Sequence, residues 1–287
     1  MQQSIQYKEL FQLQTIHKKG ILGSQVGVAV LDTGAYPHQD FNHLLSFQDY
    51  VNHRSSFYDD SGHGTHVAGI IGSRQLGAAP DCNLIILKVL NYNGEGKTSH
   101  VLQGINWVIE HKKIYNIRIM NISIGTVSKK GNPNQALLDA VNRAWDNGIV
   151  VVSAAGNQGP YPQSITTPGI SHKIITVGSC DDHLMNHFSR SYSGRGPTGS
   201  CIRKPDVVAP GSRIVSCLNR RSGYVEKSGT SMATPFVSGV LALLLSNEPY
   251  LSPKQVKLRL YETSLDMGTD KNQQGWGLIN PRGLLGV

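Results

Sequence analysis

Three short motifs in the sequence supply an acidic, a basic and a nucleophilic residue, in that order. Asp32 begins an Asp-Thr-Gly motif, His63 begins a His-Gly-Thr-His motif, and Ser231 lies within Gly-Thr-Ser-Met-Ala-Thr-Pro. A serine hydroxyl is a weak nucleophile until a neighbouring base accepts its proton, and a third group must orient that base. The sequence therefore contains the groups for nucleophilic catalysis, with Ser231 as nucleophile, His63 as base and Asp32 as the orienting acid.

The residues that follow Ser231 predict how it is positioned. An apolar run from Phe236 to Leu245 predicts a buried helix with Ser231 near its N-terminus. At that place the hydroxyl would be exposed, and the positive end of the helix would face any oxyanion that formed.

The order Asp, His, Ser and the residues around each of them resemble the subtilisin-like serine proteases, or subtilases, and especially their intracellular bacterial members. The resemblance runs from about Val26 to Ile279. A fourth segment, from Ser153 to Gly159, resembles the oxyanion-hole segment of the family, with Asn157 as the side-chain donor beside the backbone N–H of Ser231. The resemblance implies a serine endopeptidase that hydrolyses peptide bonds through an acyl-enzyme.

The resemblance also implies two strand edges that bind an extended polypeptide substrate. One edge consists of Ser123, Ile124 and Gly125, and the opposite edge consists of Gly94, Glu95 and Gly96. Gly94 and Gly96 have an equally good interpretation as ordinary turn residues.

A pocket for the substrate residue before the scissile bond (P1) would have Ala154, Ala155 and Gly156 as one wall and Thr166 near its floor. Small neutral walls favour an apolar P1 residue within a broad specificity, and Glu95 at the rim favours a basic residue further out. The resemblance also predicts a cis bond between Thr167 and Pro168, against the low general frequency of such bonds.

Short apolar runs alternate with helical patterns along the chain, which predicts an α/β fold with a mainly parallel sheet covered by helices on both faces. The predicted strands are residues 26–31, 84–89, 118–123, 149–153 and 174–177. Helices are expected to begin at Asn132-Pro133, ending at Gly148, and at Ser252-Pro253. This is the three-layer fold that the resemblance implies. We expect residues 1–25 to pack on the core as an N-terminal segment and residues 26–287 to form a single catalytic domain.

The composition fits this interpretation and argues against two kinds of partner. The 287 residues carry a formal net charge of +8, but the basic residues are scattered, so a solvated surface is favoured over a nucleic-acid interface. No stretch reaches the roughly 20 apolar residues of a membrane span. The N-terminus lacks a signal-peptide pattern, so we expect a cytoplasmic protein if Met1 is the native start, and a secreted one if a signal and prodomain were removed.

Cysteines and cofactors are expected to play little part. Cys82, Cys180, Cys201 and Cys217 have neither paired nor metal-ligand spacing, and we expect reduced thiols, with a disulfide left open for any pair that meets in space. Secreted subtilases carry a calcium loop after the histidine helix, but here residues 72–77 offer too few oxygen ligands, although Asp40 is present. We therefore expect no required cofactor or metal, with a weak cation site near Gly169 and Ile174 left open. A protein inhibitor or a prodomain remains a candidate partner.

Several alternatives remain. Asp-Thr-Gly also occurs in aspartic proteases, but those need a second such motif or a homodimer. His63 and His66 could hold a metal, although the resemblance gives catalysis to His63 and leaves His66 as a structural residue. Asp59 and Asp60 are expected to be solvated. A non-catalytic subtilase relative acting as a sensor or scaffold remains the main alternative, while a dinucleotide-binding protein lacks its glycine motif.

Overall fold

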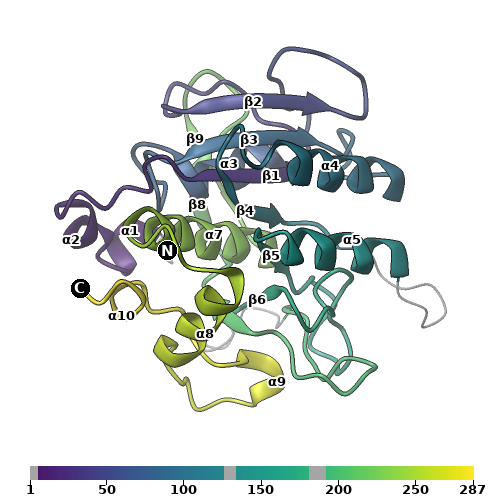
Figure 1. Ribbon diagram of the computed structural model, residues 1–287, viewed down its shortest axis with the longest axis vertical. Coiled ribbons are helices and arrows are strands. Elements are labelled where there is room, and N and C mark those ends of the chain that lie inside the picture. The colour runs from purple at the N-terminus through teal and green to yellow at the C-terminus, as the bar shows by residue number, and fades with distance from the viewer. Residues whose placement is uncertain (1–5, 126–133, 181–191) are drawn as a thin grey trace.

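The computed structural model describes residues 6–125, 134–180 and 192–287. A seven-stranded sheet lies at its centre, and all its strands pair in parallel in the order β2-β3-β1-β4-β5-β6-β7 (Figure 1). The strands are β1 (Gly27–Asp32), β2 (Leu44–Asp49), β3 (Asn83–Lys88), β4 (Ile117–Ile122), β5 (Val150–Ala154), β6 (Ile175–Ser179) and β7 (Val207–Ala209). A separate antiparallel pair consists of β8 (Ile214–Cys217) and β9 (Tyr224–Lys227).

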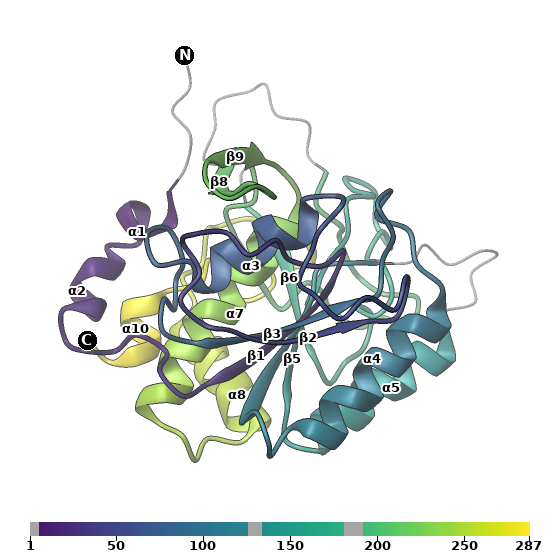
Figure 2. The same ribbon diagram turned by 90° about the horizontal axis from the view of Figure 1, so that it is seen from above.

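Helices cover both faces of the sheet, so the expected three-layer α/β fold is confirmed (Figure 2). The longer helices are α3 (His63–Gly72), α4 (Thr98–His111), α5 (Gln135–Asp146), α7 (Thr230–Asn247) and α8 (Pro253–Thr263). The shorter ones are α1 (Tyr7–Leu10), α2 (Leu13–His17), α9 (Lys271–Gln274) and α10 (Pro281–Leu285). Because α3 and α7 pack on one face and α4 and α5 on the other, no described residue of β1 is exposed.

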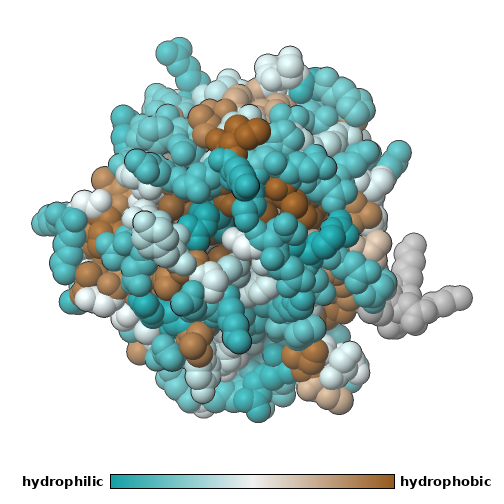
Figure 3. All heavy atoms as spheres, in the orientation of Figure 1, coloured by the Kyte–Doolittle hydropathy of each residue, from teal (hydrophilic) through white to brown (hydrophobic). Residues whose placement is uncertain are grey.

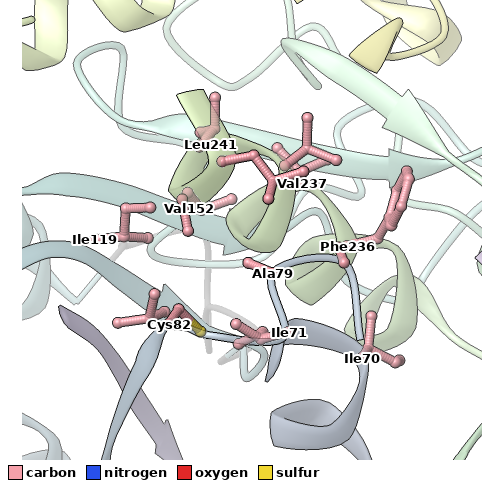
Figure 4. Packing of buried hydrophobic residues seen from close by; sticks show 14 of the residues in the cluster. Ile70, Ile71, Ala79, Cys82, Ile119, Val152, Phe236, Val237 and Leu241 are labelled. Atoms are coloured by element: carbon pink, nitrogen blue, oxygen red, sulfur yellow. The ribbon is translucent and has the colours of Figure 1, made fainter. Parts of the chain in front are cut away.

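The alternation of side chains along β1 shows how one apolar strand serves two cores. Val28 and Val30 belong to the core that α3 and α7 cover, whereas Ala29 and Leu31 belong to the core under α4 and α5. In the first core, apolar side chains of α3 and α7 meet those of the sheet (Figure 4). The labelled residues are Ile70, Ile71, Ala79, Cys82, Ile119, Val152, Phe236, Val237 and Leu241.

The helix that carries Ser231 starts earlier than its apolar run. Helix α7 begins at Thr230, six residues before Phe236, and Pro235 lies within its second turn. It is long and apolar enough to cross a membrane by length and composition, but 83% of it is buried against β4, β5 and β6 and their neighbours. Its hydrophobicity is therefore that of a core helix.

The structure describes the whole of one of the two other predicted helices and only part of the other. Helix α8 begins with a capping box at Ser252, as expected from Ser252-Pro253. Asn132 and Pro133 lie outside the described residues. Within the described residues, α5 has Asn134 as its N-cap, and Gly148 follows its end with a positive φ of 81°.

The N-terminal segment packs against the start of α7. The ring of Tyr7 stacks on Phe236 with centroids 4.0 Å apart, and its hydroxyl donates to the carbonyls of Pro210 and Met232. Leu13 and Ile16 are fully buried in the same core. On the face shown in Figure 3, hydrophilic residues surround several separate hydrophobic patches.

Candidate active site

Asp32 and His63 meet at the carboxyl edge of the sheet. Asp32 is the last residue of β1 and is fully buried, and His63 is the first residue of α3. The Nδ1 atom of His63 lies 2.7 Å from Oδ1 of Asp32, which also accepts the backbone N–H of Thr33 at 2.7 Å. Because a carboxylate only accepts, Nδ1 carries the proton and Nε2 keeps its lone pair. The contact requires Gly64, since a Cβ there would lie 2.0 Å from the carbonyl oxygen of Gly34.

The pKa of His63 is raised above its ordinary value of 6.5. Burial of the ring favours the neutral form, but the charge and the hydrogen bond of Asp32 favour the imidazolium more strongly. Since 27% of the side chain is exposed, the ring also reaches solvent. Asp32 therefore makes the ring a stronger base than a free histidine.

The expectation that Asp59 is solvated is wrong. Asp59 is only 5% exposed, and its carboxylate accepts the hydroxyls of Thr33 and Thr65 and the backbone N–H groups of Ser61, Gly62 and Thr65. Burial alone would raise the pKa of Asp59, but these hydrogen bonds outweigh it and lower the pKa. Asp59 thus fixes the turn that leads into α3 and, through Thr33, ties it to the end of β1.

Asp60 is exposed as expected, but it pairs with a buried lysine that the sequence did not single out. Lys88 is fully buried at the end of β3, beside Asp32 in the sheet. Its ammonium donates to Oδ1 of Asp60 at 2.7 Å and to the carbonyls of Thr33 and Leu90. All three N–H donors therefore have partners, which explains how a charge is tolerated in this interior position.

Ser231 lies half-buried in the first turn of α7, at the same edge of the sheet. Its hydroxyl donates to the backbone carbonyl of Ser123 at 2.9 Å. Ser123 directly follows β4 and shares a cavity with His63. The hydroxyl of Ser231 is thus bound to a residue that lines the same cavity as His63. No hydrogen bond between Ser231 and His63 is present among the described residues.

The side chain of Asn157 is oriented by Thr230. The backbone N–H and the hydroxyl of Thr230 both donate to Oδ1 of Asn157 at 3.0 Å, so the amide nitrogen points the other way. A Cβ on Gly229 would lie 3.2 Å from this nitrogen and 3.7 Å from the backbone nitrogen of Ser231. Both nitrogen atoms therefore lie close to Gly229, whose φ of 150° is one that residues with side chains rarely adopt.

The two predicted substrate edges, residues 94–96 and 123–125, both line one cavity of about 390 Å³, which His63 also lines. Four apolar residues outside the predicted site line the same cavity: Leu90, Val101, Ile122 and Leu137. Their sequence pattern is that of ordinary core residues, so nothing in the sequence alone marked them as cavity residues.

The residues expected around the P1 side chain occupy different depths. Ala154 and Ala155 are buried. Thr166 is only 6% exposed, and a Cβ on Gly125 or Gly156 would come within 2.5 Å of its side chain. The Thr167–Pro168 bond is cis, as predicted. Thr166 therefore packs closely against the backbone at both glycines.

The side chain of Asp40 is engaged by other groups of the protein. The carboxylate of Asp40 accepts from the backbone N–H of Gln75 and the hydroxyl of Tyr224, and it faces Arg74 at 3.7 Å. Within the described ranges there is no cluster of three or more acidic, histidine or cysteine side chains that could hold a metal. Cys82, Cys201 and Cys217 are free thiols.

His66 has a structural environment. It is fully buried, and its Nε2 lies 3.0 Å and 3.1 Å from the carbonyl oxygens of Ile214 and Val225. Burial lowers the pKa of His66 to about 3. The ring is therefore neutral at physiological pH and ties α3 to β8 and β9.

Comparisons with known proteins agree with this geometry. A model of the subtilase family matches residues 23–277. The chain is 40% identical to the serine protease AprX of Bacillus subtilis (strain 168) over 91% of its length, and 34% identical to the minor extracellular protease Epr of the same organism over 94%. It spans 66% of AprX and 40% of Epr.

A crystal structure of a cold adapted subtilisin-like serine proteinase superposes on the chain with a TM-score of 0.75. That protein is 34% identical, and the match covers 90% of this chain and 88% of the other. A family model that covers most of the chain and a close structural match point to the same conclusion. The chain belongs to the subtilase family.

Proposed function

We propose that the chain is an endopeptidase in which Ser231 attacks the scissile carbonyl. His63 Nε2 takes the proton from the hydroxyl and passes it to the leaving amine, while Asp32 stays ionised and orients the ring. The hydrogen bond of 2.7 Å between His63 and Asp32 carries this proposal, because it sets the tautomer that leaves Nε2 basic. The Ser231 hydroxyl must turn from the Ser123 carbonyl toward His63 before attack, as apo enzymes often require.

The oxyanion of the tetrahedral intermediate would bind between Asn157 and Ser231. The amide nitrogen of Asn157 and the backbone N–H of Ser231 flank the space beside Gly229. Ser231 is the second residue of α7, and the first N–H groups of a helix have no partner within it. Both donors are thus fixed before the negative charge develops.

The substrate would be an extended polypeptide bound between residues 94–96 and 123–125. The apolar lining of this cavity supports a broad specificity with a preference for apolar side chains. Thr166, by filling the space between Gly125 and Gly156, would in addition favour small P1 residues. Glu95 is exposed at the rim and would favour a basic residue further along the substrate.

No metal takes part in the proposed mechanism. Asp40 is already engaged by protein donors, which supports activity and stability without tightly bound calcium. The name of the minor extracellular protease Epr favours a secreted location over a cytoplasmic one. A prodomain or a protein inhibitor that occupies the same cavity is a further proposed partner.

Casein hydrolysis by the purified chain tests the proposal. The wild-type protein and Ser222→Ala, which alters an exposed serine, should both hydrolyse casein, also in the presence of EDTA. Ser231→Ala should lose about 10⁶-fold in kcat while keeping its circular dichroism spectrum. Undiminished turnover by Ser231→Ala, or activity that chelators abolish, would refute the proposed mechanism. A folded wild-type chain without any hydrolysis would favour the alternative of a sensor or scaffold.

A further inference from the structure

The first turn of α7 depends on contacts from outside the helix. Pro235 lies in the second turn and has no N–H, so it cannot donate to the carbonyl of Ser231 as the helical pattern requires. Gly229, the residue before the helix, donates its N–H to the carbonyl of Gly211 at 2.8 Å. The backbone around Ser231 is therefore held in part by the segment that follows β7.

One hydroxyl from the N-terminal segment contacts both of these backbone segments. Tyr7 belongs to α1, which lies beside α7 (Figure 1), and is only 3% exposed. Its hydroxyl donates to the carbonyl of Met232 at 3.0 Å and to the carbonyl of Pro210. One carbonyl belongs to the residue after Ser231, and the other to the residue before Gly211. The two carbonyls share a single proton, so Tyr7 connects the first turn of α7 to the segment after β7.

The ring of Tyr7 is held independently of its hydroxyl. It stacks on Phe236 with centroids 4.0 Å and planes 9° apart, and Phe11 stacks on Phe236 with centroids 4.7 Å apart. Further along the segment, Leu13 and Ile16 are fully buried in the core. Tyr7→Phe would therefore keep the packing of the segment and lose only the two hydrogen bonds.

We propose that Tyr7 is a positioning residue for the nucleophile and acts through the backbone of α7. By fixing the carbonyl of the next residue, the Tyr7 hydroxyl sets the direction of the Ser231 side chain and of the Ser231 backbone N–H. Thr230 belongs to the same turn and orients Asn157 through two hydrogen bonds, so both oxyanion donors depend on this turn. A misplacement of about 1 Å can cost roughly 10²-fold in rate. The inference rests on the proposed function, because it concerns the rate of attack by Ser231.

The test compares Tyr7→Phe with the wild type in peptide hydrolysis. We expect kcat to fall on the order of tenfold and KM to stay within about twofold, because the residues that line the substrate cavity come from other elements. The acid limb of the pH profile should keep its midpoint, since the contact between Asp32 and His63 is not altered. Tyr115→Phe is the matched control. It removes a hydroxyl from a ring that stacks on Trp107 before the start of β4, and it should leave kcat unchanged.

A variant of the same aromatic cluster separates positioning from stability. Phe11→Leu weakens the stack on Phe236 and removes no hydrogen bond to the two carbonyls, so it should lower the melting temperature and keep kcat. A purely structural role predicts that Tyr7→Phe lowers kcat no more than Phe11→Leu does. That result would overturn the proposal, and so would a change confined to KM. Failure of Tyr7→Phe to fold would also overturn it, because the hydroxyl would then be needed for folding.

Hydrogen exchange followed by mass spectrometry tests the contact without any activity. Peptides that cover residues 229–236 should exchange faster in Tyr7→Phe than in the wild type and in Tyr115→Phe. Equal exchange in all three proteins would contradict the proposal. A folded wild type that hydrolyses no peptide would refute the proposed function instead, and the exchange rates would still decide whether Tyr7 holds the first turn of α7.

Discussion

Oδ1 of Asp32 accepts a hydrogen bond from Nδ1 of His63 at 2.7 Å, and this contact joins the end of β1 to the start of α3. This contact changes the pH at which His63 loses its proton. Because Asp32 raises the pKa of His63, the imidazolium persists to a higher pH than in a free histidine. The base is lost as the pH falls through that raised pKa.

We therefore expect the acid limb of kcat/KM to have its midpoint above the ordinary histidine value of 6.5. Asp32→Asn should lower this midpoint, since the attracting charge is gone, and should reduce kcat by about 10⁴-fold. A pH profile of peptide hydrolysis for both proteins measures this effect. An acid limb with the same midpoint in Asp32→Asn would show that another group controls the titration.

Asn157→Leu should lower kcat by about 10²–10³-fold with little change in KM, because the lost hydrogen bond forms only with the oxyanion. This magnitude is the one known for the equivalent asparagine of subtilisin, and family membership is the reason to transfer it. Gly229→Ala should have a similar kinetic effect, since its Cβ would crowd the same space. If KM rose in Asn157→Leu while kcat held, the residue would bind the substrate instead.

Thr166→Gly should deepen the P1 pocket. The change removes the side chain that fills the space between Gly125 and Gly156, so kcat/KM for substrates with Phe at P1 should rise about tenfold relative to those with Ala. Thr166→Ser, which removes only the methyl group, should give a smaller increase. The measurement is a matched pair of peptide substrates, and an unchanged Phe-to-Ala ratio in both variants would place the P1 side chain elsewhere.

Asp59→Asn should destabilise the protein by about 1–3 kcal/mol at neutral pH, because the amide group would face N–H donors that now lack an acceptor. The folded-state pKa of Asp59 lies below its ordinary value of 3.8, so its contribution is present above that value and is lost as the pH falls through the lowered pKa. Urea unfolding at several pH values should show the difference shrinking in strong acid. Asp139→Asn, at an exposed position, is the control, and equal effects of both variants would contradict the role of Asp59.

The sequence predicted the buried strands well because they lie between two layers of helices. The runs at β1, β3, β4, β5 and β6 are mostly apolar, and their predicted bounds differ from the observed ones by one or two residues. Strand β2 was missed because it mixes polar and apolar residues at the edge of the sheet, and β7 has only three residues. The start of α7 was predicted near Ser231, and the helix begins at Thr230.

The candidate triad was predicted from its motifs, whereas the groups that support it were not. The sequence predicts a solvated Asp59, but the structure buries its carboxylate. Its hydrogen-bond partners come from both sides of it in the sequence, from Thr33 to Thr65. Lys88 becomes buried only because the turn that carries Asp60 folds back over the end of β3. Pairings of this kind depend on tertiary structure, and local residue patterns contain no signal for them.

Labelling with a serine-directed fluorophosphonate tests the central claim most directly. Intact mass and peptide mapping should find one adduct on the wild-type chain, at Ser231, because this is the hydroxyl that the proposed mechanism activates through His63. His63→Ala should react far more slowly, and Ser231→Ala should not react. An unlabelled but folded wild type, or an adduct at another serine that persists in Ser231→Ala, would contradict the account.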